Sequence, residues 1–109
     1  MAMTPEKKVK NKVVKILKEL GTYHFYPVTG GYGGSGVPDI VGSYYGKFFG
    51  IECKAGKNKP TALQLKNLQE IAESGGIAIV INEDNIDDVP KYLSGKSPNP
   101  QQLEFNFGD

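Results

Sequence analysis

The sequence predicts an α/β fold whose elements follow the order helix, three strands, helix, strand, helix. Three observations support this prediction. Apolar residues recur at helical spacing in two segments, aromatic and β-branched residues recur at the two-residue spacing of strands in the middle of the chain, and residues 77–81 form a continuous apolar run. The 109 residues suffice for one compact domain. A hydrophobic content of 39% excludes a wholly disordered chain.

The first helix is predicted to begin after Thr4, a suitable N-cap, and to end at Gly21. Pro5 suits the first helical position, and Glu6 suits the positive end of the helix dipole. Apolar residues then recur on one helical face: Val9, Val13, Ile16, Leu17 and Leu20.

Three strands are predicted next, at Tyr23–Val28, Asp39–Ser43 and Lys47–Ala55, where aromatic and β-branched residues are frequent. A turn at Tyr45-Gly46 joins the last two into a hairpin. The loop Gly30–Gly36 lacks the Gly-Lys-Ser/Thr of a phosphate-binding loop, and a strand follows it where a dinucleotide-binding loop needs a helix. It is interpreted either as a flap or as a plain connector.

The second half is predicted to contain a helix, a buried strand and a short acidic helix. Pro60 and Thr61 open the first of these helices, and the pair Gly75-Gly76 closes it. The run Ile77–Ile81 is typical of a strand covered on both faces. A last helix is expected at Asn85–Leu93. The expected apolar stripe of the longer helix is Leu65, Leu68, Ile71 and Ala72.

Residues 94–109 are rich in Gly, Ser, Pro, Asn and Gln, so we expect a tail or arm after a folded domain at residues 1–93. No apolar run approaches the ~20 residues that cross a bilayer, and the lysine-rich N-terminus lacks the apolar part of a secretory signal. The single cysteine, Cys53, excludes an intrachain disulfide and a cysteine metal cluster. We therefore expect a cytoplasmic protein without a membrane partner.

The net charge of +1 conceals a separation of charge along the chain. Residues 1–20 carry six Lys and two Glu (+4), and residues 51–69 carry four Lys and one Glu (+3). Residues 70–93 carry six acids and one Lys (−5). The basic segments form either one face that attracts a polyanion or scattered solvated surface. All 13 basic residues are Lys, so any DNA binding is expected to be directed at the backbone.

The hairpin carries the most informative side chains. Strand alternation puts Glu52 and Lys54 on one face, and a turn centred on Tyr45-Gly46 puts Asp39 directly across from Glu52. Facing carboxylates repel each other, so a divalent cation such as Mg²⁺ between them is one interpretation. The other is an exposed patch in which Lys54 neutralises both acids.

Glu6, Gln64 and His24 each have a plain structural interpretation beside a functional one. Glu6 shares the apolar face of the first helix and is either a metal ligand or a dipole complement. Gln64 either completes a capping box with Thr61 or points into a cleft. His24 lies on a strand with no evident Ser or Cys partner, which favours a structural histidine over a catalytic one.

These residues form an ordered set that resembles the PD-(D/E)xK nuclease superfamily. The set comprises Gly36-Val37-Pro38-Asp39, then Glu52-Cys53-Lys54 after a short hairpin, Gln64 on the following helix and Glu6 on the preceding one. Within the superfamily, the chain is most similar to stand-alone virus-type replication-repair nuclease (VRR-NUC) domains of phage and bacteria. The resemblance covers roughly residues 4–93.

The resemblance implies an αβββαβ core with a mixed sheet flanked by helices. It implies Mg²⁺ or Mn²⁺ held by Asp39, Glu52 and the backbone carbonyl of Cys53, with Lys54 orienting the attacking water. Glu6 corresponds to the family's auxiliary acid, which is also a metal ligand. Gln64 corresponds to the family's glutamine. Cys53 stands where the family usually has Val, Ile or Leu.

The function that follows is a metal-dependent endonuclease acting on branched DNA such as four-way junctions, as a homodimer in a bacterial or phage-infected cell. A non-catalytic DNA-binding module and a replisome-interaction module remain alternatives. Gln102–Phe107 resembles the bacterial sliding-clamp-binding motif Gln-Leu-x-Leu-x-Phe, with Phe105 where Leu is usual. The same arm would otherwise pack on its own domain or on a dimer partner.

Overall fold

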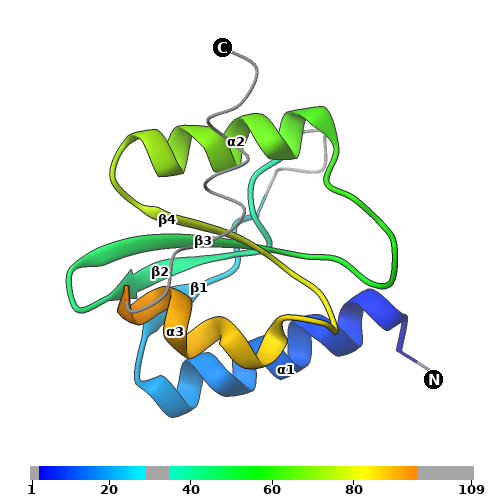
Figure 1. Ribbon diagram of the computed structural model, residues 1–109, viewed down its shortest axis with the longest axis horizontal. Coiled ribbons are helices and arrows are strands. Elements are labelled where there is room, and N and C mark those ends of the chain that lie inside the picture. Colours follow the sequence, from blue (N-terminus) through cyan, green and yellow to red (C-terminus); the bar gives the residue numbers. More distant parts are fainter. Residues whose placement is uncertain (1–2, 29–34, 96–109) are drawn as a thin grey trace.

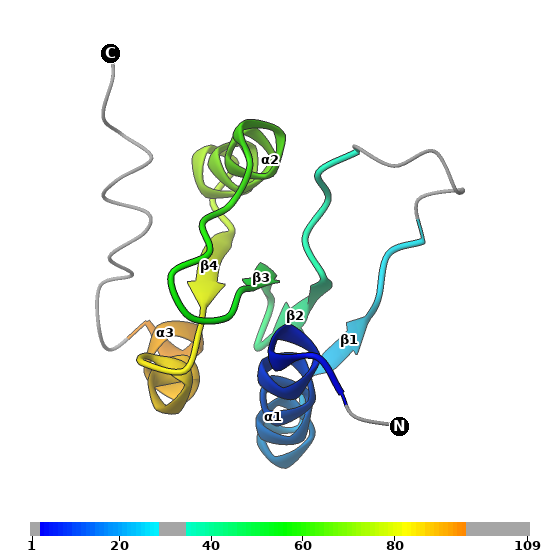
Figure 2. The ribbon, with the colours of Figure 1, turned by 90° about the vertical axis from the view of Figure 1, so that its right-hand side faces the viewer.

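In the computed structural model, a four-stranded sheet lies between helices α1 and α3 on one face and α2 on the other (Figures 1 and 2). The structure describes residues 3–28 and 35–95. This is the predicted α/β fold with the predicted order of elements. Their bounds are α1 Pro5–Leu20, β1 Tyr23–Phe25, β2 Ile40–Tyr44, β3 Lys47–Cys53, α2 Ala62–Glu73, β4 Ile77–Ile81, the 3₁₀ turn η1 Ile86–Asp88, and α3 Val89–Ser94.

The sheet is mixed, with the strand order β1-β2-β3-β4. The pairs β1/β2 and β2/β3 are antiparallel, whereas β3 and β4 are parallel. A parallel pair needs a long crossover connection, which α2 supplies. The parallel strands β3 and β4 therefore receive cover from both helical layers.

Helix α1 forms as its capping residues predict. The Thr4 hydroxyl accepts a hydrogen bond from the Lys7 N–H (3.1 Å), and Gly21 ends the helix with a φ of +78°. Its buried residues pack on the odd-numbered side chains of β3 and β4 and on α3. The centre of this larger core is made by Val13, Leu17, Phe49, Ile51, Ile79 and Ile81, all with 0% exposure.

The opposite face of the sheet carries a smaller core beneath α2. Leu68 is buried there with Ala78, and Ile71, Ala72 and Val80 pack against them. The sequence prediction for this helix was wrong at Leu65, which is 39% exposed. Because α2 lies over β3 and β4 alone, its buried stripe is narrower than the apolar spacing indicates.

The predicted bounds of the first three strands were also wrong by one to three residues. The first strand ends at Phe25 instead of Val28, since Pro27 has no N–H for a ladder. The hairpin strands span Ile40–Tyr44 and Lys47–Cys53, so Asp39 and Ala55 lie just outside them. Beyond the pair Ile40–Ile51, the chain before β2 no longer follows β3 as a strand.

The predicted helix Asn85–Leu93 is divided into η1 and α3. Pro90 lies in the first turn of α3. Its missing N–H prevents a continuous α-helix from residue 86 onward. None of the helices in the two described segments has the length and apolar character to span a membrane.

Candidate active site

The hairpin has the register that the sequence predicts. Tyr45 and Gly46 form its turn, both with positive φ (+50° and +83°), as a two-residue turn of this hand requires. The last β2–β3 pair is Ile40–Ile51. Asp39 lies one residue before this pair, outside β2, and alternation along β3 directs Glu52 to the face of the sheet that α2 covers.

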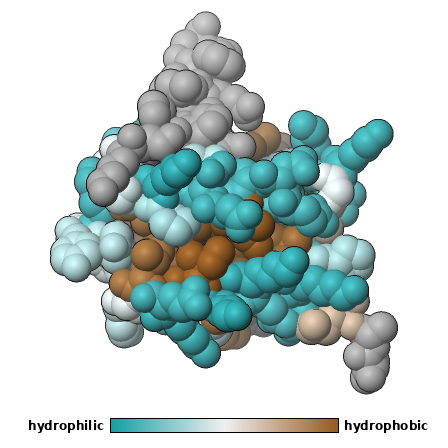
Figure 3. Space-filling model, turned by 60° about the horizontal axis from the view of Figure 1, so that its bottom comes forward, coloured by the Kyte–Doolittle hydropathy of each residue, from teal (hydrophilic) through white to brown (hydrophobic). Residues whose placement is uncertain are grey.

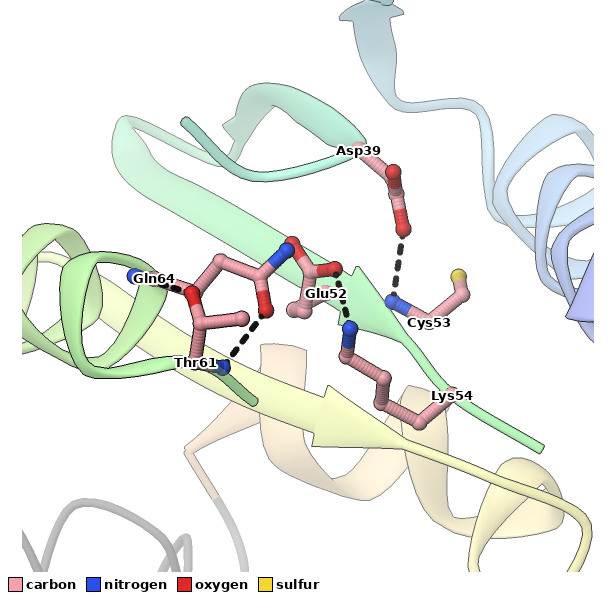
Figure 4. Close-up of polar contacts among 6 residues, drawn as sticks. All are labelled: Asp39, Glu52, Cys53, Lys54, Thr61 and Gln64. Carbon is pink, nitrogen blue, oxygen red and sulfur yellow. Dashed lines mark hydrogen bonds and ion pairs between the residues drawn. The ribbon is translucent and has the colours of Figure 1, made fainter. Parts of the chain in front are cut away.

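Glu52 is the buried acid of this face, with 2% of its surface exposed. On β4 its partner is Val80, and its Oε2 lies 3.5 Å from Lys54 Nζ in an ion pair (Figure 4). The pKa of Glu52 is raised to about 7, chiefly by burial and also by the charges of Asp39 and Glu6, while Lys54 opposes this shift. The site therefore holds a carboxyl group whose ionisation is disfavoured. Additional positive charge beside Glu52 would favour the ionised form.

Asp39 is fixed by the backbone of β3. Its Oδ2 accepts a hydrogen bond from the N–H of Cys53 at 2.9 Å (Figure 4). In a regular ladder a carbonyl of β2 would accept this bond, but β2 begins only at Ile40. The carboxylate thus takes the place of a missing strand residue, which is a structural role that requires no metal.

The Cys53 carbonyl completes the oxygen donors at this edge. In a strand, the N–H and C=O of one residue face the same neighbouring strand, so the Cys53 carbonyl faces the Asp39 side. The Cys53 side chain instead lies in the core with 0% exposure, and burial raises the pKa of its thiol. Cys53 therefore offers its backbone, as the resemblance implies, and its buried thiol remains protonated.

Glu6 lies near the acids, although it belongs to a separate hollow. It occupies the first turn of α1, and its negative charge raises the pKa of both Glu52 and Cys53. A hollow of about 390 Å³ lies beside it, lined by Thr4, Pro5, Ala55, Gly56, Asn58 and Glu83. In residues 3–28 and 35–95, no three His, Cys, Asp or Glu side chains form a group that could hold a metal ion. Glu6 therefore does not complete a three-acid cluster.

Gln64 makes the capping box that was one of its two interpretations. Its Oε1 accepts from the Thr61 N–H (2.9 Å), while Thr61 Oγ1 accepts from the Gln64 N–H (3.2 Å). The side chain is half-buried and lies on the Glu52 and Lys54 side of β3 (Figure 4). The cap thus holds Gln64 near the acids without a bond that identifies a catalytic role.

The segment that leads into Asp39 is anchored on α2, a feature that sequence reasoning missed. The Ser35 carbonyl accepts a hydrogen bond from Asn67 Nδ2 (3.1 Å). Gly36 has a φ of +71°, and a Cβ there would lie 2.7 Å from Leu63 Cγ. No local pattern signals a contact across 32 residues. Most of the predicted glycine loop (29–34) lies outside the described residues.

His24 has the contacts of a structural histidine. Its Nδ1 lies 2.8 Å from the Thr22 hydroxyl, which also donates to the Leu17 carbonyl (3.2 Å). His24 pairs with Gly42 and points to the α1 face of the sheet, away from Glu52. These bonds connect the end of α1 to β1.

The two basic segments meet at one end of the molecule. The start of α1 and the loop after β3 line the same hollow, and the loop comes close to the N-terminus of α1 in Figure 1. Glu83, which follows β4, closes this end, since its Oε1 accepts from the Gly56 N–H (2.9 Å), a bond that lowers the pKa of Glu83. The start of α1 and the loop after β3 thus share one region, which the acids Glu6 and Glu83 also line.

A second hollow lies on the opposite face of the sheet. Figure 3 shows an apolar strip between hydrophilic residues on that side of the molecule. A pocket of about 530 Å³ lies between Ile16 of α1 and Ile86 of η1, with Lys12, Lys15, Glu19 and Asp87 around it. It faces away from Glu52 and has no part in the acid site.

No protein-family model matches the chain, and no curated protein has a significantly similar sequence. The acid site must therefore be judged on its own donors. Two carboxylates and a backbone carbonyl are hard oxygen ligands of the kind that Mg²⁺ and Mn²⁺ prefer, with waters filling the other positions. A cation there would also stabilise the ionised form of Glu52, so the residues present fit a divalent metal.

Proposed function

We propose that this protein is a metal-dependent DNA endonuclease that hydrolyses phosphodiester bonds. One observation carries the proposal: a buried carboxyl group, Glu52, lies at the end of a central strand beside Asp39 and an ion-paired Lys54. A buried acid beside a second acid destabilises the fold, and such costs concentrate at functional sites. The αβββαβ order of the resemblance, present here, is consistent with this function.

In the proposed mechanism, Asp39, Glu52 and the Cys53 carbonyl would hold the cation, and the Lys54 ammonium would orient the attacking water. When bound, Mg²⁺ or Mn²⁺ supplies charge that stabilises the phosphoryl oxygens. By the resemblance, Glu6 would be the auxiliary acid and Gln64 the auxiliary glutamine. Following the resemblance, we further propose branched DNA as the substrate. We propose a homodimer as the active form, because a chain of 109 residues offers little surface for recognising branched DNA alone.

A second candidate function is a DNA-binding or replisome-interaction module without catalysis. The Asp39–Cys53 hydrogen bond favours it, since this bond explains Asp39 as a structural residue. The proposed sliding-clamp motif Gln102–Phe107 would suit either function, and it lies outside the described residues. Cleavage distinguishes the two.

The test is incubation with four-way, flap, nicked and linear DNA, each with Mg²⁺, Mn²⁺ or EDTA. Cleavage is expected with either metal, and EDTA should abolish it. Asp39→Asn, which keeps the acceptor for Cys53, and Glu52→Gln should each lower the rate at least ~100-fold, since each removes a ligand charge. Lys54→Met should lower it as well.

Glu70→Gln, on the exposed side of α2, is the matched control and should cleave at the normal rate. Near-normal cleavage by Asp39→Asn or Glu52→Gln would overturn the nuclease assignment. Metal-independent DNA binding without any cleavage would support the binding module instead.

A further inference from the structure

The face of the sheet that carries Glu52 continues into exposed aromatic side chains. The strand register places Tyr23, Ser43 and Phe48 in one row across β1, β2 and β3. Phe25 lies in the next row, and alternation along each strand puts all of these side chains on the face of Glu52. The acid site and the aromatic rings thus share one side of the sheet.

These rings are open to solvent because α2 covers only the other half of this face. Tyr23 is 73% exposed, Phe25 49% and Phe48 46%. Figure 2 shows α2 over β3 and β4, with β1 displaced to the side. We call Tyr23, Phe25 and Phe48 the aromatic surface.

We propose that the aromatic surface binds unpaired bases of a single-stranded DNA segment next to the cleaved phosphate. This inference rests on the proposed nuclease function and specifies its substrate as DNA with a single-stranded part. Bases stack on exposed Tyr and Phe rings without regard to sequence. A chain whose basic residues are all Lys, with no guanidinium for base readout, suits such recognition.

The spacing between rings and acids suits neighbouring nucleotides. The ring centres of Tyr23 and Phe25 are 6.3 Å apart, so two successive bases would each meet one ring. Phe25 pairs with Val41, two residues after Asp39. Phe25 thus lies beside the part of β2 that directly follows Asp39.

The charge around the aromatic surface favours a polyanion. Residues 20–38 and 40–51 contain no Asp or Glu, and Lys47 begins β3. The acids of the chain are concentrated instead at residues 70–93. A DNA strand leaving the acid site would therefore meet less repulsion over β1 and β2 than over the last helices.

The same surface is too small to be a stable interface with a second copy by itself. With ~200 Å² for each ring side chain, the three rings expose roughly 350 Å². A stable interface takes ~800 Å² from each partner. One or two stacked bases fit the smaller area.

The test measures DNA binding in EDTA, where no cleavage occurs. The probes are a blunt duplex and the same duplex with a single-stranded overhang that carries 2-aminopurine. Wild-type protein should bind the overhang DNA more tightly and quench its fluorescence. Tyr23→Leu combined with Phe25→Leu should weaken overhang binding about tenfold or more, because flat rings are lost, and leave duplex binding unchanged.

Tyr26→Leu is the matched control, since Tyr26 lies against Lys10 of α1 instead (5.1 Å to the ring centre) and should bind both probes normally. Should the double variant fail to fold, Phe48→Leu tests the same surface from β3. Unchanged overhang binding would overturn the inference, as would a double variant that alters only self-association.

The two proposals can fail separately. If the double Leu variant loses overhang binding and the wild type cleaves no DNA, the aromatic surface is supported and the nuclease is rejected. Metal-dependent cleavage that is insensitive to both Leu substitutions would support the nuclease and reject the aromatic surface.

Discussion

Glu52 shows at the level of one residue how a buried carboxyl group opposes stability. It is almost fully buried, its pKa is raised to about 7 against an ordinary value of 4.5, and its Lys54 partner offsets the penalty only in part. The sequence identified the acid and its face from alternation alone. Glu52 is buried by Val80 on β4 and by α2. The local sequence around Glu52 does not predict this packing, because both segments are distant in the chain.

This raised pKa predicts a pH dependence of stability in metal-free buffer. Because the folded protein binds the Glu52 proton more tightly than the unfolded chain does, stability should rise as the pH falls from about 8 to about 5. Above pH 7 the ionised group costs about 3 kcal/mol of unfolding free energy. Glu52→Gln should remove this cost, so the variant should be the more stable protein at pH 8.

Urea unfolding of both proteins at pH 5 and pH 8 measures the effect. The difference between variant and wild type isolates Glu52 from the other titrating groups. A difference that is equal at the two pH values would contradict the prediction. Addition of Mg²⁺ at pH 8 should stabilise the wild type and leave Glu52→Gln nearly unaffected.

At the level of elements, the attachment of β1 depends on a glycine. A Cβ at Gly42 would collide with the Tyr23 carbonyl and would lie 2.8 Å from His24 Cα. Both are backbone atoms of the neighbouring strand, so no side chain can move aside. The three residues of β1, two of which carry the aromatic surface, stay in place only while residue 42 lacks a side chain.

Gly42→Ala is therefore expected to destabilise the protein by about 1–3 kcal/mol, as overpacking does. Ser43→Ala, the adjacent residue on the other face, should change stability by less than about 0.5 kcal/mol. Thermal unfolding gives the stabilities, and amide exchange at residues 23–25 reports the pairing of β1. Equal stability of the two variants would show that β1 adapts to the added methyl.

At the level of the whole molecule, basic and acidic segments lie side by side. The start of α1 and the loop after β3, both rich in Lys, line one hollow, and Asp87 of η1 lines a pocket together with Lys12 and Lys15 of α1. The Lys ammonium group interacts with DNA phosphates as a point charge. The proposed DNA binding should therefore depend strongly on salt and little on base sequence.

Lys57→Ala, in the exposed loop after β3, should weaken DNA binding and reduce the salt slope by about one. Lys91→Ala should have no such effect, since Lys91 lies on α3 with Asp88 (4.0 Å). Titration of DNA at several salt concentrations, with scrambled sequences of one structure, checks both points. A preference of more than about tenfold among scrambled sequences would contradict backbone recognition.

The sequence by itself determined the order of elements, the caps of α1 and α2, the hairpin register and the face to which Glu52 points. Each of these depends on residues that are near in the chain, through helical spacing, strand alternation or turn chemistry. Only the tertiary structure decided that Glu52 is buried, that Asp39 replaces a strand partner of Cys53, and that Leu65 is exposed. These outcomes depend on which half of the sheet α2 covers, a packing choice between segments far apart in the sequence.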